Sequence, residues 1–240
     1  MRFFDYDSPL MSALTKVANL MILNLLTLIC CIPVITAGAA LTALHYMCLK
    51  MVRNEDSYIV KGYFVAFKES FKQATKVWLV LLLIILVLAG DFLIINLSGI
   101  QFPYWFHVVF YVVGIIALFE CMMVFPIMGK FENTTLRTMK NALIISVAKF
   151  PITILMVVMN IVPIAIVLYF LQIVPIALMF GFAVPAYFSE KLLNKYFKKL
   201  EEHILEAQGL NKPDATEEED DGVEKIFNDQ LDEALAGKKD

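Results

Sequence analysis

The fold is decided by the stretch ITILMVVMNIVPIAIVLYFLQIVPIALMFGFAVPAYF (Ile152–Phe188), which runs for 37 residues without a charged side chain. A helix needs about 20 apolar residues to cross the roughly 30 Å hydrocarbon core of a bilayer. The stretch is therefore too long for one membrane span and predicts two short spans, with a turn near Leu171–Pro175. A chain with such a segment is an integral membrane protein.

Three further runs have the length of a membrane span. Val17–Thr36 has no charged residue. Val77–Leu97 has one charged residue, Asp91, and Tyr104–Met128 has one, Glu120. Together with the two spans of the long stretch, these runs predict an all-α fold, a polytopic membrane helix bundle with five transmembrane helices. The composition agrees, because 60% of residues are hydrophobic and 18% are charged, against about 25% charged in ordinary soluble domains.

The segment Ala37–Leu49 extends the first apolar run beyond the length of one span. Pro33 and Gly38 can interrupt a helix at this point. The segment is open to three interpretations: a cytoplasmic continuation, a re-entrant half-helix or a sixth span. A cleaved signal peptide is disfavoured, because Asp5 and Asp7 precede an apolar run that exceeds the usual length.

The basic residues alternate between successive connections and predict the orientation of the chain. Segment 37–76 carries six basic residues, 98–103 carries none, 129–151 carries four, the turn of the last apolar stretch carries none, and 189–208 carries four. We therefore expect a multi-pass protein of the cell membrane with a cytoplasmic C-terminus. With five spans the N-terminus is external, whereas a sixth span would place it inside.

The chain divides into two parts by charge. Residues 1–208 form the predicted membrane helix-bundle domain. Residues 209–240 hold eleven acidic and four basic residues, and this composition predicts an acidic, largely disordered cytoplasmic tail. Within the tail, Val223–Leu235 is a short amphipathic piece and a candidate for docking on the basic loops.

Two connections predict interfacial basic amphipathic helices. In Val60–Lys76 an aromatic stripe lies beside a lysine stripe, a pattern typical of helices in the headgroup plane. The alternative is a solvated helix that packs on other cytoplasmic segments. Thr134–Phe150 repeats the pattern more weakly. Membrane lipid is thus an expected partner, and the candidate lipid-interface residues are Lys61, Lys68, Lys72 and Lys76.

Polar residues inside the spans are costly in hydrocarbon and are candidates for function. They could serve as interhelical hydrogen bonds, a polar pathway for a solute or proton, or contacts with a partner subunit. Their depths predict a contact between Asn24 and Asp91, whereas no partner for Glu120 is evident. The candidate intramembrane polar residues are Asn24, Asp91, Glu120 and Asn160.

The sequence contains no motif that predicts catalysis. It lacks the GxxxxGK[ST], GxGxxG, HExxH and GxSxG patterns, so nothing indicates nucleotide binding, a zinc protease or a nucleophilic serine. The four cysteines lie in or beside apolar runs and are expected to be small buried hydrophobes. We therefore expect no enzyme activity, no catalytic or metal residues, no cofactor and no nucleic-acid partner.

Four segments carry a resemblance to a known family. They are FDYDSPLMSAL at residues 4–14, LNLLTLICCIPVITAGAALTALHYMCLKMVRNED at 23–56, YFVAFKESFKQATKVWL at 63–79 and IFND at 226–229. The chain resembles the bacterial YesL family, membrane proteins of unknown function found mainly in Gram-positive bacteria. Genes of this family often lie beside those for carbohydrate ABC transporters and glycoside degradation. The resemblance implies a role around sugar uptake, with no known mechanism or site residue.

Two functions from different classes follow. The first is a non-enzymatic integral membrane protein, accessory to carbohydrate uptake through association with an ABC transporter or its sensing apparatus. This function fits the absence of an EAA-type coupling loop, which would mark a permease subunit. The alternative is a small autonomous transporter or channel with Asp91, Glu120 and Asn160 along its pathway. The sequence leaves the ligand and the oligomeric state open.

Overall fold

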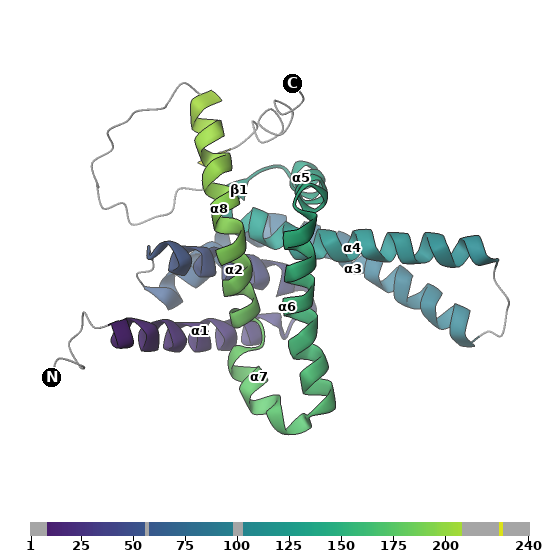
Figure 1. Ribbon diagram of the computed structural model, residues 1–240, viewed down its shortest axis with the longest axis horizontal. Coiled ribbons are helices and arrows are strands. Elements are labelled where there is room, and N and C mark those ends of the chain that lie inside the picture. The colour runs from purple at the N-terminus through teal and green to yellow at the C-terminus, as the bar shows by residue number, and fades with distance from the viewer. Residues whose placement is uncertain (1–8, 56–57, 98–102, 208–225, 228–240) are drawn as a thin grey trace.

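The computed structural model describes residues 9–55, 58–97, 103–207 and 226–227, and this part of the chain is helical apart from two short strands (Figure 1). Five of its helices are long and apolar enough to cross a membrane. The predicted all-α, polytopic membrane helix bundle is therefore confirmed. The five helices are α1 (Pro9–Cys31), α2 (Ala37–Arg53), α3 (Ile59–Leu97), α4 (Tyr104–Lys130) and α6 (Phe150–Tyr169).

The long uncharged stretch divides near the predicted turn. Helix α6 ends at Tyr169, a 3-10 turn follows at Leu171–Ile173, and α7 (Val174–Phe180) then returns. The returning segment is interrupted, because α7 and α8 (Ala183–Ala207) meet at a bend of 44°. The predicted fifth span is thus a bent pair of helices, and counting this pair with the five long helices gives up to six spans.

Helices α1 and α2 form a hairpin around Pro33. A 3-10 turn at Val34–Thr36 joins them, and the side chain of Lys16 near the start of α1 donates a 2.7 Å hydrogen bond to Asn54 Oδ1, directly after α2. The beginning of α1 and the end of α2 therefore lie on the same side of the molecule. The open question about Ala37–Leu49 is answered in part, because the segment is a separate helix that runs back along α1.

Helix α2 lies at the centre of the bundle, in contact with α1, α3, α4 and α8. Its first turns consist of small residues, and the space for a side chain at Gly38 is already occupied by Ala74 and Trp78 of α3. Gly129 of α4 approaches the backbone of α2 at Tyr46 in the same way. Such close approach through small residues is how helices gain packing contacts where lipid removes the hydrophobic drive.

Helix α3 is continuous over 39 residues and is therefore about 58 Å long at 1.5 Å per residue. Its first half contains the predicted amphipathic segment, which is not a separate helix. The face that packs on α2 is the row Ile59, Tyr63, Ala66, Ser70 and Ala74, all buried. Of the aromatic residues on this segment, Tyr63 is in the buried row, Phe67 and Phe71 are half-buried beside it, and Phe64 is exposed.

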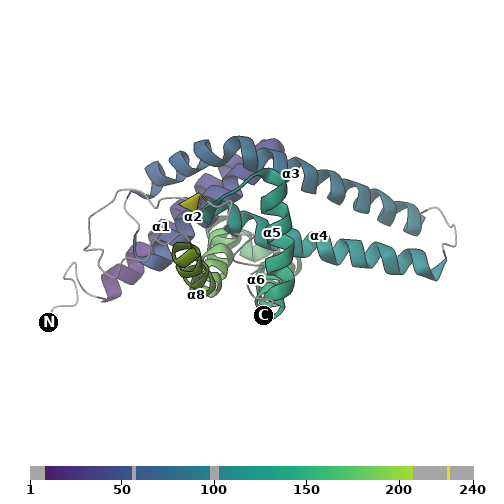
Figure 2. The ribbon, with the colours of Figure 1, turned by 90° about the horizontal axis from the view of Figure 1, so that it is seen from above.

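Two helical hairpins extend from the core. Figure 1 shows α3 with α4, and α6 with α7, leaving the core in clearly different directions, and Figure 2 shows the length of the first hairpin. Their outward side chains are apolar, for example Leu86 and Leu168. Helix α5 (Thr135–Ala148) connects the two hairpins. Apolar surfaces of this kind suit a lipid environment.

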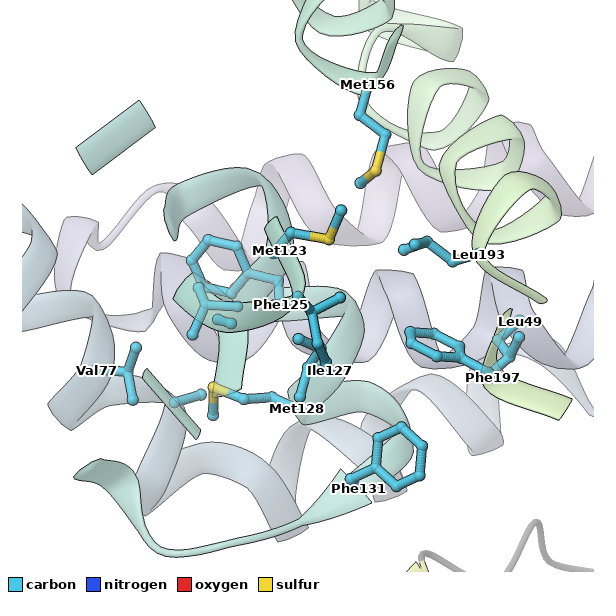
Figure 3. Close-up of a cluster of buried hydrophobic side chains, with 14 of the residues drawn as sticks. Leu49, Val77, Met123, Phe125, Ile127, Met128, Phe131, Met156, Leu193 and Phe197 are labelled. Atoms are coloured by element: carbon cyan, nitrogen blue, oxygen red, sulfur yellow. The ribbon is translucent and has the colours of Figure 1, made fainter. Parts of the chain in front are cut away.

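One cluster of buried hydrophobic side chains joins the end of α4 to α6 and α8. Figure 3 shows Met123 of α4 near Met156 of α6 and Leu193 of α8, with Phe131 beside Phe197. The rings of Phe131 and Phe197 meet edge to face with their centroids 5.6 Å apart. This packing fixes the end of α8 against the end of α4.

The two strands bring part of the C-terminal tail to this region. Strand β1 (Phe131–Glu132) follows α4 directly and pairs in parallel with β2 (Ile226–Phe227). The predicted docking of the tail is therefore seen for these two residues. The rest of the tail lies outside the described residues, and the disorder predicted for it stays a prediction.

Candidate functional site

The ends of α2, α4 and α8 are joined by a group of three charged side chains and one amide that we call the base cluster: Arg53, Lys130, Glu201 and Asn194. Arg53 donates to both carboxylate oxygens of Glu201, at 2.8 and 3.3 Å, and its Nε donates to Asn194 Oδ1 at 3.0 Å. Lys130 Nζ lies 2.9 Å from Glu201 Oε1. One carboxylate therefore holds cations from two other helices.

The base cluster is shielded from solvent. The side chains of Lys130, Arg53 and Glu201 are 4%, 8% and 15% exposed. Buried ions are tolerated only when they are paired with good geometry, and the two-pronged contact of arginine with carboxylate is the strongest such geometry. The sequence analysis counted Arg53 and Lys130 only as orientation signals, and no pattern pointed to Glu201 as their shared partner.

A second polar contact crosses from α2 to α8 inside the bundle. His45 Nδ1 lies 2.8 Å from Glu190 Oε1, and Glu190 is fully buried. The second oxygen of this carboxylate has no hydrogen-bond partner among the described residues. No sequence pattern pointed to this pair. The available signal was that His45 is the first Asp, Glu, His, Lys or Arg residue after Lys16, and that Glu190 is the first after Lys149.

Asn24 holds the third contact, between α1 and the bend of α7 and α8. Its Oδ1 accepts hydrogen bonds from the backbone N–H groups of Phe182 and Ala183, at 2.7 and 2.9 Å. Its Nδ2 donates to the carbonyl oxygen of Leu178 at 2.8 Å. Asn24 is completely buried, so its amide serves only these backbone groups.

The predicted contact between Asn24 and Asp91 is therefore wrong. The bend frees backbone groups of α7 and α8, and these bind Asn24 instead. Asp91 lies farther out on α3 and lines a groove of about 360 Å³ between α3 and α4. The groove is otherwise lined by apolar side chains such as Val87 and Phe110.

The two other intramembrane candidates also lie apart. Glu120 is buried in α4, and neither of its oxygens has a hydrogen-bond partner in the described part of the chain. Asn160 donates to the carbonyl oxygen of Met156 in its own helix, at 2.8 Å. Among the described residues, none of the four candidate residues forms a hydrogen bond with another.

The candidate lipid-interface residues share one face of α3. Lys61, Lys68, Lys72 and Lys76 are all exposed, and at 100° per residue they lie opposite the row that packs on α2. A cationic stripe on the outer face of a helix is available to anionic headgroups. Binding of lipid by these four lysines remains a prediction.

Each of these contacts joins residues of different helices. Within the described ranges, no group of three or more His, Cys, Asp and Glu residues could hold a metal ion. The three polar contacts connect α2, α4 and α8 at one end, α2 with α8 inside the bundle, and α1 with the bend. Their common effect is to fix the position of α8.

Comparison with known proteins identifies one family. Residues 20–92 match the model of a family described as "Protein of unknown function, DUF624", and this segment runs from the middle of α1 through α2 to Phe92 of α3. No curated protein and no solved structure matches the chain. Over residues 20–92 the chain is similar to the DUF624 family, which corresponds to the YesL-like membrane proteins that its sequence resembles.

Proposed function

We propose that this protein is a non-enzymatic accessory protein of the membrane, which assembles with a carbohydrate ABC transporter or its sensing apparatus. The observation that carries the proposal is the dispersal of the polar groups. Asn24 serves the bend, Asn160 serves its own helix, and Asp91 lies in a separate groove. A transport pathway needs such groups along one route, whereas a scaffold needs them between helices.

The carbohydrate part of the proposal rests on the family resemblance and on the gene associations it implies. The accessory part is supported by a central bundle fixed by ion pairs and by two long apolar hairpins. Helices that expose apolar faces can pack against the spans of another membrane protein, provided that small or polar residues fit the contact.

The proposal is tested by crosslinking in native membranes, followed by purification of the tagged chain and mass spectrometry. Subunits of a carbohydrate transporter or a sugar-sensing kinase should be enriched when the cells grow on the sugar in question. The control is the same purification without crosslinker. Partners found in both samples are stable, and those found only after crosslinking are transient. Recovery of the chain without any sugar-related protein would contradict the proposal.

We also propose an orientation for the chain. The basic connections support a cytoplasmic position for the loops 37–76 and 129–151 and for the C-terminus. The contact of Lys16 with Asn54 supports an N-terminus on that same side. The lysine-bearing half of α3 runs beside α2, which favours a re-entrant α1–α2 hairpin over two complete spans. The external N-terminus expected for five spans is the alternative.

Reporter fusions distinguish these orientations. Reporters placed after Lys72, Arg137 or Lys199 should be cytoplasmic, and one placed in 98–103 should be external. A reporter at the N-terminus should be cytoplasmic, because the hairpin returns the chain to its starting side. An external N-terminus would support the five-span arrangement, and a cytoplasmic position for 98–103 would overturn the orientation altogether.

The second candidate function is a small autonomous transporter or channel. One observation favours it, namely that the buried carboxylate of Glu120 has no hydrogen-bond partner among the described residues. A buried ionisable group without a partner is a common component of proton and ion pathways in membranes. Reconstitution into liposomes separates this function from the accessory one.

A further inference from the structure

A cavity of about 450 Å³ lies between α6 and the bent pair of α7 and α8. All of its lining side chains are apolar. Those from α6 include Val162 and Ile166, and those beside the bend are Phe180, Val184 and Pro185. The cavity is formed by residues of the 37-residue uncharged stretch, so its natural surroundings are the hydrocarbon of the bilayer.

The bend that opens this cavity has an identifiable cause. Phe182 follows Leu178 by four residues, so its N–H would bond the Leu178 carbonyl in a regular helix. The amide of Asn24 lies between these two groups instead, accepting from one and donating to the other. Pro185 adds to the bend, since its ring clashes with the Gly181 carbonyl group four residues earlier and it has no N–H to donate. A side chain inserted into the helical ladder produces a sharp kink.

Three polar backbone groups freed by the bend are bound on the α1 side. Phe182 N–H, Ala183 N–H and the Leu178 carbonyl all bond to Asn24. The cavity therefore has an apolar lining on its other side. A buried water needs two to four polar partners, and a sugar needs more. Hydrocarbon is the remaining chemistry that matches this lining.

We propose that the cavity binds one acyl chain of a membrane lipid and that Asn24 is the positioning residue that keeps the cavity open by holding the bend. The lipid headgroup takes no part in the selection, because no charged or polar side chain lines the cavity. The bound acyl chain completes the packing between α6 and α8 within one protein molecule. This site is independent of the proposed accessory function.

The proposal is tested by native mass spectrometry of the full chain. The protein is reconstituted with a defined lipid, extracted in detergent, and freed of the detergent in the spectrometer. The wild type should retain one lipid per chain, at equal levels for phosphatidylglycerol and phosphatidylethanolamine with the same acyl chains. Ala177→Phe fills the cavity, which Ala177 lines, and should lower the retained lipid at least tenfold. Ala165→Phe is the matched control, because Ala165 is exposed on the same hairpin, and should leave retention unchanged.

The role of Asn24 is tested by two substitutions. Asn24→Asp keeps the oxygen that accepts from Phe182 and Ala183 but loses the N–H that donates to the Leu178 carbonyl. It should therefore retain less lipid than the wild type and more than Asn24→Ala. Asn24→Ala allows Phe182 and Leu178 to bond each other directly, and should reduce retention severalfold while the chain stays folded. Any misfolding of this variant is recognised by gel filtration, and Ala177→Phe then decides the proposal alone.

Three results would overturn the inference. The first is equal lipid retention in Ala177→Phe and Ala165→Phe. The second is retention that depends on the headgroup, which would place the lipid elsewhere. The third is a dimer that Ala177→Phe dissociates, since a second copy of the chain would then occupy the cavity.

Discussion

Replacement of Glu201 by alanine should remove about 3–5 kcal/mol of stability, because it leaves two buried cations without their partner. Arg53 and Lys130 both bond this carboxylate, and both are at least nine-tenths buried. Folded proteins are stable by only about 5–15 kcal/mol. The variant should therefore unfold at a much lower temperature in detergent, or fail to yield folded protein.

The adjacent carboxylate provides the control for this prediction. Glu202 is exposed, and Glu202→Ala removes the same charge from the same turn of α8. Thermal unfolding of the two variants, followed by gel filtration with a fluorescent tag, separates the pairing from the general effect of charge. Similar unfolding temperatures for Glu201→Ala and Glu202→Ala would show that the base cluster does not stabilise the fold.

Gly38→Ala is expected to be the other severe substitution. A β-carbon at this position would lie 2.5 Å from Trp78 Cβ and 2.6 Å from the backbone oxygen of Ala74. Neither atom can move without shifting α3, so α2 and α3 must separate. Overpacking of this kind costs about 1–3 kcal/mol and sometimes more. The separation also weakens the hydrogen bond that Trp78 donates to the Val34 carbonyl.

Gly90 provides a matched glycine on α3. Nothing lies within 4 Å of the β-carbon that Gly90→Ala would add, and alanine is favoured over glycine in a helix by about 1 kcal/mol. Gly38→Ala should therefore lower the unfolding temperature, whereas Gly90→Ala should leave it unchanged or raise it. Equal effects of the two substitutions would contradict the close packing of α2 on α3.

The sequence predicted the spans because hydropathy and charge report directly on length and environment. The turn near Leu171–Pro175 appears in the structure between α6 and α7. The continuity of α3 was not predictable in this way. The change at Val77 from a lysine-bearing to an apolar surface is a change of composition, and composition alone does not break a helix.

The partners of polar residues were harder to predict than their positions. Several partners are possible for Asn24 from its position in the sequence. Its actual partner depends on which face of α1 packs on the bundle and on a bend that frees backbone groups. The bend itself could not be predicted from Gly181 and Pro185, because glycine and proline are common in membrane helices. Glu201 was missed for a related reason, because a carboxylate after a span resembles any other solvated charge until α2 and α4 are placed beside it.

The central claim, that the chain is an accessory protein rather than a transporter, is tested most directly by flux in sealed liposomes. The purified protein should move neither a panel of sugars nor protons above the rate of empty liposomes, because its intramembrane polar groups do not form one route. Transport by the wild type that Asp91→Asn or Glu120→Gln abolishes, with both variants still folded, would contradict the claim and assign these carboxylates to a pathway.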